Sequence, residues 1–329
     1  MKKMLSVILA LVLCLGCLSA LAEVSGELLV YTSADDRLIS EICNRFNAKY
    51  PNAHAEYYRS GTEEVVSKLM AEKMTNSIQA DIIMISDTPT MEMFKANDML
   101  AVYESPEIEN ICIDFVDPER MYYGTFPTAM GICYNTNLAE KPLTSWKDLL
   151  EEFTKDNAIM PSPLYSGTAC YAMMEITRAE GLGWDYYQGL YDNGIMVVNG
   201  NGGVVNSVAA GEKIYGIVNE SACFTAINKG SPLAFVYPEE GVPSTCDPVA
   251  ILKTTENVSA AQAFVDFMLS KDIQELGRDI LGQTPTRAEV TLGAGSMPLS
   301  ERTLMINDAK VLYEGREEDK EVFADMFDM

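Results

Sequence analysis

Short apolar runs along this chain alternate with stretches in which apolar residues recur every three or four positions. The first are typical of buried strands and the second of one face of a helix. The run Leu28–Tyr31 precedes a helical pattern that ends at Pro51, and a strand near 53–58 precedes a second helix. The continuous apolar run Ala80–Ser86 completes a β-α-β-α-β order. Buried strands linked by helices form a parallel sheet, so we expect a doubly wound α/β lobe.

The same alternation restarts near Phe126 and predicts a second α/β lobe. Strands are expected near 129–135, 158–162, 196–198 and 213–219, with helices near 146–153, after 168 and after 203. A turn-rich stretch, 237–248, then precedes a helix at 260–269. In open α/β sheets ligands bind beyond the carboxyl ends of the strands, where many polar residues of this chain stand.

Two copies of the tripeptide Ser-Gly-Thr each precede a predicted helix, one in each half of the chain. They are Ser60-Gly61-Thr62 and Ser166-Gly167-Thr168, 106 positions apart. The first N–H groups of a helix have no partner within it, and glycine lets the backbone approach a ligand, so such turns can hold an anion. Ser and Thr are also ordinary N-cap residues, and Ser60 with Glu63 fits a capping box. Either copy alone favours capping; the pair favours an anion site shared by two lobes.

The first 22 residues have the pattern of an export signal. Lys2 and Lys3 precede an apolar run, and small residues at Ala20 and Ala22 suggest cleavage before Glu23. A second interpretation is lipidation at Cys17. No later segment is apolar over the length of a membrane span. We therefore expect an exported protein, in the periplasm or at the cell surface, that meets the membrane only through a permease or a lipid on Cys17.

The charge balance restricts the partners. The chain has 24 basic and 48 acidic side chains, a net charge of −24, which disfavours nucleic acids and anionic membranes. A small anion responds to local dipoles and is not excluded. The cysteines that follow the signal form no CxxC pair, so a zinc site is not expected, and buried thiols are favoured over disulfides. With a single histidine, His54, no catalytic, metal or cofactor site is predicted.

The order of several motifs resembles the type II solute-binding proteins of ABC importers, in the group of ferric-iron, organophosphate and phosphonate binders. The motifs are Leu29-Val30-Tyr31-Thr32-Ser33, Ala80-Asp81-Ile82-Ile83, Gly131 to Asn137, Pro163 to Thr168, Asn257 to Ser270 and Thr284-Pro285-Thr286-Arg287. The resemblance implies a monomer of two lobes joined by crossing strands, which closes on a small-molecule ligand and delivers it to an ABC permease and its ATPase. It divides the chain into lobe 1, 23–125 plus about 240–286, and lobe 2, 126–239 plus about 287–329.

The resemblance also implies which residues bind the ligand. In the organophosphate and phosphonate branch, hydroxyls and helix N-termini hold the phosphoryl group while acids opposite bind hydroxyls or an amine. The matching positions for the anion are Ser33, Ser60, Gly61, Thr62, Ser166, Gly167 and Thr168. Glu220 matches the acidic place, with a solvated loop acid as its alternative, and Asp87 is a further candidate, with a helix cap as its alternative. The expected ligand is a small phosphoryl or phosphonate anion, and a zwitterion such as an aminoalkylphosphonate would fit both the turns and an acid. Arg59 and Arg287 are further candidate cations.

Other functions remain open at this point. The ferric branch binds metal through consecutive tyrosines, but the matching place reads Asn219-Glu220-Ser221, so iron is an alternative rather than the first choice. Sugar-phosphate binders have a His-Asp pair where this chain has Asn199-Gly200-Asn201. A polyamine would suit the acidity, using Asp35, Asp36, Asp87 and Glu220. A surface adhesin would bind no small ligand, and an enzyme lacks a readable nucleophile and base.

Overall fold

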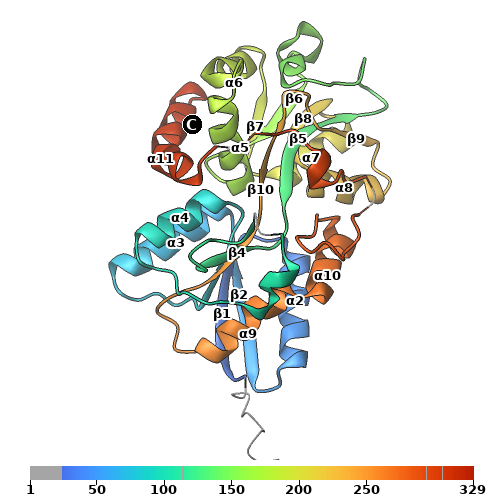
Figure 1. Ribbon diagram of the computed structural model, residues 1–329. Coiled ribbons are helices and arrows are strands. Elements are labelled where there is room, and N and C mark those ends of the chain that lie inside the picture. Colours follow the sequence, from blue (N-terminus) through green and yellow to red (C-terminus); the bar gives the residue numbers. More distant parts are fainter. Residues whose placement is uncertain (1–23, 113–114, 294, 306) are drawn as a thin grey trace, which may run out of the picture.

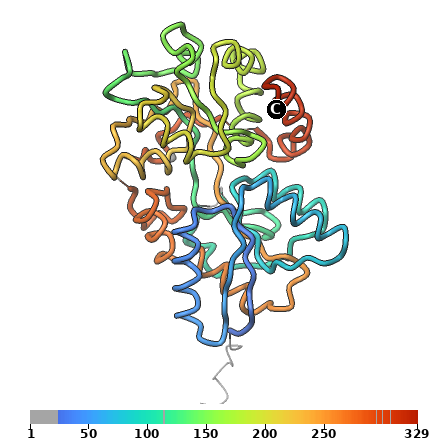
Figure 2. The backbone as a smooth tube through the Cα atoms, turned by 180° about the vertical axis from the view of Figure 1, so that it is seen from behind, coloured from blue at the N-terminus to red at the C-terminus, as the bar shows by residue number. Residues whose placement is uncertain are grey.

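The computed structural model describes residues 24–112, 115–293, 295–305 and 307–329. Two α/β lobes lie one above the other, each built on its own sheet (Figure 1). Seen from behind, the chain passes between the lobes more than once (Figure 2). The predicted export signal and Cys17 lie outside the described residues. Among the described helices, none has the length and apolar character that a membrane span needs.

Lobe 1 is a doubly wound sheet, as the sequence pattern predicted. Its strands, in spatial order, are β2 (Ala53–Arg59), β1 (Gly26–Thr32), β3 (Ile82–Met84), β11 (Pro248–Ile251) and β4 (Tyr122–Gly124). The first three are parallel, and β11 is antiparallel to both of its neighbours. One face packs against α2 (Asp36–Lys49), α9 (Val258–Leu269) and α10 (Lys271–Leu281), and the other against α3 (Thr62–Met74) and α4 (Thr88–Ala96). A short 3-10 helix, η1 (Pro106–Asn110), completes this lobe.

Lobe 2 contains a mixed sheet that is also covered on both faces. Its spatial order is β12 (Leu304–Met305), β10 (Val242–Thr245), β5 (Thr128–Asn135), β8 (Tyr215–Asn219), β6 (Ala158–Pro161) and β7 (Met196–Val198), with β9 (Leu233–Val236) also paired to β5. Helices α5 (Gly167–Arg178), α6 (Gly183–Asp192) and α11 (Ala309–Met326) pack on one side. Helices α7 (Asn201–Ala210) and α8 (Glu220–Asn228) pack on the other.

The chain passes between the lobes three times; the third passage leads from α10 to β12, and the first two are neighbouring segments at the waist of the molecule. The first runs from β4 to β5 and the second from β10 to β11, and β5 and β10 are antiparallel partners (Figure 1). The second crossing therefore falls between Thr245 and Pro248, a few residues after the expected boundary near 240. The Thr125 amide donates to the carbonyl of Asp247 at 3.1 Å, which ties the two crossings together.

Three local predictions were wrong or incomplete. The helix expected near 146–153 consists of two short 3-10 helices, η3 (Trp146–Leu150) and η4 (Glu152–Thr154). The turn-rich stretch 237–248 contains β10 and the first residue of β11, because tertiary pairing overrides the weak local preference of a Pro-containing segment. Helix α11, which the apolar pattern did not reveal, packs on lobe 2 and also contacts α4 of lobe 1.

Candidate functional site

A cavity of about 510 Å³ lies between the two lobes. Five helices begin at its wall: α2 and α3 from lobe 1, and α5, α7 and α8 from lobe 2. Each contributes residues at or just before its first turn, where unpaired N–H groups and the positive end of the helix dipole are found. The cavity therefore presents several N-termini to whatever it encloses, an arrangement that suits an anion.

Both Ser-Gly-Thr turns line this cavity, and they touch each other across the lobes. A Cβ built on Gly167 would lie 2.7 Å from Thr62 Oγ1, and one on Gly61 would lie 2.6 Å from the ring of Tyr165. A side chain on Gly167 would overlap the Cβ of Thr62 and so push the opposite lobe away, and one on Gly61 would displace the ring of Tyr165. The sequence thus identified two turns that the fold brings into contact.

The helix starts differ in how their N–H groups are satisfied. The N-caps of α3 and α7 are Gly61 and Gly200, and neither helix has a side-chain cap. In α5 the Ser166 hydroxyl accepts a long hydrogen bond of 3.4 Å from the Ala169 amide. The capping box of Ser60 and Glu63, the alternative interpretation of the first turn, does not form: the Ser60 hydroxyl donates to Glu64. The first N–H groups of α3 and α7 are thus left without a side-chain acceptor at the cavity.

Polar side chains surround the two turns. The Asn201 amide donates to Thr168 Oγ1 at 3.1 Å and to Ser166 Oγ at 3.4 Å, and the hydroxyls of Ser166 and Thr168 are 3.1 Å apart. On the lobe 1 side, Ser33 Oγ lies 3.4 Å from Ser86 Oγ. All of these residues line the cavity. Hydroxyls can rotate to donate to an anion, so this ring adds donors to the backbone N–H groups.

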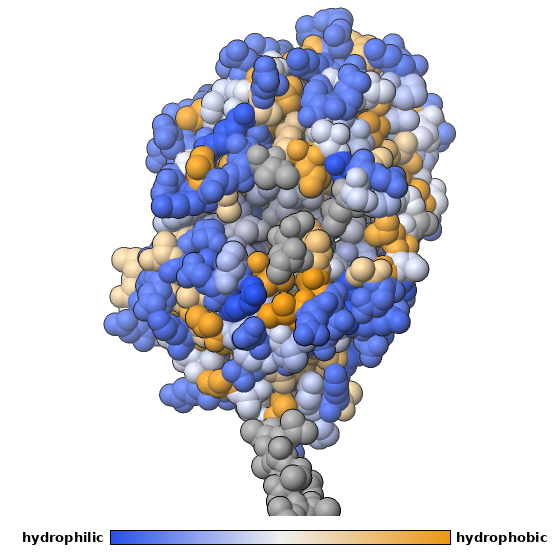
Figure 3. Space-filling model, viewed as in Figure 1, coloured by the Kyte–Doolittle hydropathy of each residue, from blue (hydrophilic) through white to orange (hydrophobic). Residues whose placement is uncertain are grey.

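Charged side chains also reach the wall. Arg37 pairs with Asp35 at 2.9 Å, and Arg59 Nε donates to the carbonyl of Ala34 at 3.0 Å. Burial raises the pKa of Asp35, but hydrogen bonds from the Arg37 side chain and backbone outweigh burial and leave that pKa below its usual value. Lys229 is an exposed cation at the edge of the cavity. On the outer face in Figure 3, hydrophilic residues cover much of both lobes.

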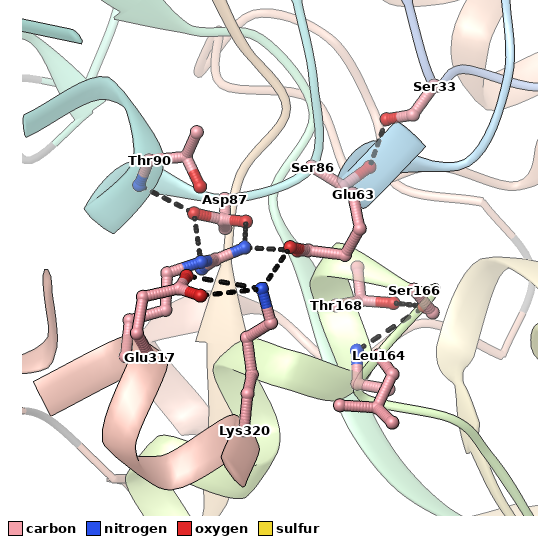
Figure 4. A network of polar contacts seen from close by, with 12 residues as sticks. Ser33, Glu63, Ser86, Asp87, Thr90, Leu164, Ser166, Thr168, Glu317 and Lys320 are labelled. Atoms are coloured by element: carbon pink, nitrogen blue, oxygen red, sulfur yellow. Dashed lines mark hydrogen bonds and ion pairs between the residues drawn. The ribbon is translucent and has the colours of Figure 1, made fainter. Parts of the chain in front are cut away.

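Asp87 was expected to contact the ligand, and the structure places it elsewhere. Its side chain accepts from the Thr90 amide at 2.7 Å, as the N-cap of α4, and lies 3.3 Å from the Arg316 guanidinium of α11. Glu63 bonds to the same guanidinium and accepts from Lys320 at 3.0 Å. Figure 4 shows Lys320 joined to Glu63 and Glu317, with Asp87 close by and joined to Thr90. Asp87 is fully buried in this interlobe ion network and is absent from the cavity wall.

Glu220 was likewise expected in the site and is instead part of the core of lobe 2. One carboxylate oxygen lies 2.8 Å from Arg302 Nη1 and accepts from the Ala129 amide at 3.1 Å. Its other oxygen accepts from the Tyr237 hydroxyl at 2.5 Å. The side chains of Glu220 and Arg302 are 1% and 0% exposed, so both are paired away from solvent. Arg287 is also committed elsewhere, to Glu107 and Glu289 in lobe 1.

Several wall residues were not identified from the sequence, and three polar ones among them matter for the argument. Asp247 lies in the crossing between β10 and β11, Thr128 begins β5, and Gln283 follows α10. Burial raises the pKa of Asp247 to about 6, against the lowering effect of a hydrogen bond with Ser86. The Thr128 hydroxyl is buried and has no hydrogen-bond partner within the described part of the chain. None of these positions lies in a recognisable motif, because the topology alone brings them to the floor of the cavity.

Two sheets wound on both faces, two neighbouring chain crossings and a polar cavity between the lobes define the class of periplasmic-type binding proteins. Residues 41–300 match the family described as bacterial extracellular solute-binding proteins, and this chain belongs to it. It is a type II solute-binding component of an ABC importer. Proteins of this family bind a small ligand and work with a permease and an ATPase; the family is a transport family rather than a class of enzymes.

Individual relatives differ in what they are described as binding. The chain is 22% identical over 251 residues to a probable ABC transporter periplasmic-binding protein, y4fP, of Sinorhizobium fredii, which covers 74% of this chain and 70% of that one. The structure of the present chain resembles that of periplasmic binding protein AfuA of Actinobacillus pleuropneumoniae with exogenous fructose-6-phosphate bound. The TM-score is 0.85 and the sequences are 26% identical, and the match covers 92% of this chain and 99% of AfuA. The structure also resembles that of iron-bound HitA of Pseudomonas aeruginosa. Here the TM-score is 0.80 and the sequences are 19% identical, and the match covers 90% of this chain and 99% of HitA.

Proposed function

We propose that the protein captures a small anionic solute carrying a phosphoryl or phosphonate group. The observation that carries this proposal is the contact of the two Ser-Gly-Thr turns at one cavity, where Gly167 of α5 meets Thr62 of α3. Closure of the lobes brings two helix N-termini and four hydroxyls around a single volume. An anion placed there gains charge-assisted hydrogen bonds from both lobes, so that binding and closure support each other.

The distribution of charge supports the same choice over a cation. The polyamine alternative relied on Asp87 and Glu220, and both carboxylates are buried in ion pairs with arginine. Asp35, a third acid in that set, is paired with Arg37. The wall carries three cationic side chains, Arg37, Arg59 and Lys229, against two carboxylates, Asp35 and Asp247, so its charge balance favours an anion even though the whole chain is strongly acidic.

Ferric iron remains a second candidate because an iron-bound relative shares the fold. Its weakness is the donor set: β8 ends in Asn219, a cap of α8, where the ferric branch has tyrosines. Among the described residues, no group of three or more His, Cys, Asp or Glu side chains is placed to hold a metal ion. A sugar phosphate, as in AfuA, fits the anion site, but Gly200 and Asn201 stand at the wall where the resemblance calls for a His-Asp pair.

We further propose that the chain is exported by its first 22 residues and acts outside the cytoplasm as a monomer. The extracellular family supports this proposal. Mass spectrometry of the protein secreted by its native host would identify the first residue, and a mass consistent with neither cleavage before Glu23 nor a lipid on Cys17 would refute it.

Thermal unfolding with a panel of ligands tests the proposed substrate class. The panel contains phosphate, sugar phosphates, alkyl and aminoalkyl phosphonates, ferric citrate and spermidine at equal excess. A ligand at a hundred times its dissociation constant adds about 2.7 kcal/mol of stability. We expect stabilisation by phosphoryl or phosphonate compounds. Stabilisation by ferric citrate or spermidine alone would refute the proposal, and no response to any compound would place the ligand outside this panel and equally refute a phosphoryl or phosphonate ligand of the tested kinds.

A pair of double variants connects any stabilisation to the proposed site. Ser166→Ala with Thr168→Ala removes two wall hydroxyls and should lower affinity by about 1.5–3 kcal/mol per lost charge-assisted bond. Thr75→Ala with Ser77→Ala is the matched control, because those exposed hydroxyls are also two residues apart and in contact, at 2.7 Å. Equal affinity of the two double variants would place the ligand elsewhere.

A further inference from the structure

The floor of the cavity contains a carboxylate that lacks a cationic partner. Asp247 is 7% exposed and lines the cavity at the crossing between β10 and β11. The Gln283 amide donates to it over a long 3.4 Å, and no ion pair joins it to any described residue. The charged side chains on the same wall are occupied or exposed: Arg37 pairs with Asp35, Arg59 donates to Ala34, and Lys229 lies in solvent.

Other acceptors lie beside this carboxylate. Thr128 is 5% exposed, and its hydroxyl has no partner among the described residues. Thr128 pairs with Thr245 in the β5–β10 ladder, and Thr245 is two residues before Asp247. Thr128 and Asp247 therefore belong to neighbouring crossing segments. Ser86 lies beside the same carboxylate, because its side chain forms a hydrogen bond with Asp247. All three residues line the cavity, and the Thr128 hydroxyl is a buried group whose hydrogen-bonding capacity no described residue uses.

Burying an unpaired carboxylate is costly, and a ligand can remove that cost. Burial already raises the pKa of Asp247 to about 6. An ammonium group has three N–H donors, no acceptor and a positive charge, so it can neutralise the carboxylate and still donate to neighbouring oxygens. A ligand hydroxyl would donate a single hydrogen bond and would leave the charge without a counterion.

We infer that Asp247, with Thr128 and Ser86, forms a second subsite that binds an ammonium group of the ligand. The inference rests on the proposed anion site at the two Ser-Gly-Thr turns and extends it. The ligand is then a zwitterion, with its phosphoryl or phosphonate group at the helix N-termini and its ammonium group at the floor of the cavity. Asp247 selects this ligand over an alkyl phosphate or phosphonate of the same length.

Calorimetric titration of the purified protein with matched compounds tests the subsite. The probes are O-phosphoethanolamine and 3-aminopropyl phosphate, ethyl and propyl phosphate as their analogues without nitrogen, and ethylene glycol phosphate. In the wild type we expect an amino compound to bind about 10- to 150-fold more tightly than its alkyl analogue, the range of a hydrogen bond to a charged group. In Asp247→Asn that preference should disappear while the alkyl phosphates keep their affinity.

A control variant separates the charge at this position from a general effect of the substitution. Asp266→Asn makes the same chemical change at a partly buried acid that accepts from Tyr103 and Ser105, outside the cavity. It should keep the wild-type preference. The comparison of ligands in the wild type is decisive even if Asp247→Asn fails to fold.

The outcomes distinguish the two levels of inference. Equal binding of amino and alkyl compounds to the wild type, or a preference that persists in Asp247→Asn, overturns the ammonium subsite and leaves the anion site intact. Binding of ethylene glycol phosphate as tight as that of O-phosphoethanolamine overturns it as well, since a hydroxyl then suffices. If neither the alkyl nor the amino phosphates bind, the proposed anion site itself fails.

Discussion

Replacing Gly167 with alanine tests whether ligand binding requires the two Ser-Gly-Thr turns to meet. The added Cβ would lie 2.7, 2.8 and 2.9 Å from the Oγ1, Cγ2 and Cβ atoms of Thr62, whereas ordinary van der Waals contact is 3.4–4 Å. Rotation of the Thr62 side chain cannot relieve the overlap, because its Cβ is one of the atoms involved. The lobes must therefore separate here by about 0.7 Å, the difference between 3.4 and 2.7 Å.

Overpacking of this kind costs about 1–3 kcal/mol, which corresponds to about 5- to 150-fold in affinity. The cost arises only when the lobes are together, because Thr62 and Gly167 belong to different lobes. We expect Gly167→Ala to lower the affinity for the best phosphoryl compound by that factor in a calorimetric titration. Gly202→Ala is the control, since a Cβ there meets nothing within 4 Å although it lines the same cavity. Equal affinities for the two variants would refute the reasoning.

Three further substitutions test the ion pairs and the carboxylate at the floor. Arg316→Met leaves the buried Asp87 without its cation and leaves Glu63 paired with Lys320 alone, so urea titration should show a loss of about 3–5 kcal/mol, against about 0.5 kcal/mol for Arg45→Met at an exposed pair. Glu220→Gln should cost about 3 kcal/mol or more of stability and leave phosphoryl affinity unchanged; weakened binding at full stability would restore Glu220 to the site. The pKa of Asp247 is about 6 in the folded protein and 3.8 ordinarily, so folding favours the protonated carboxyl. The stability that this carboxyl contributes is complete below pH 3.8 and is lost as pH rises through 6, by up to about 3 kcal/mol. Asp247→Asn should therefore match the wild type near pH 4 and exceed it in stability at pH 8, and a gain that is equal at both pH values would contradict this assignment.

Local sequence signals predicted the parts of the site that depend on local chemistry. The two Ser-Gly-Thr turns were found because a polar turn before an apolar helical pattern is a helix N-terminus wherever it occurs. Their mutual contact could not be derived from spacing, since 106 residues separate them. The doubly wound lobe 1 was predicted for the same reason, whereas β10 was hidden in a turn-rich stretch whose strand character comes from pairing with β5.

The acids show why the remaining site residues could not be assigned. In the sequence, Asp87 and Glu220 stand at the ends of strands and look free, but their cations are 229 and 82 residues further along. Asp247 lies at a crossing with no motif around it, yet it is the wall carboxylate for which no described residue provides a cation. Sequence position tells which acids can reach a cleft. Only the fold tells which of them have already been neutralised, and the acid without a cationic partner is the one whose charge is available to a ligand.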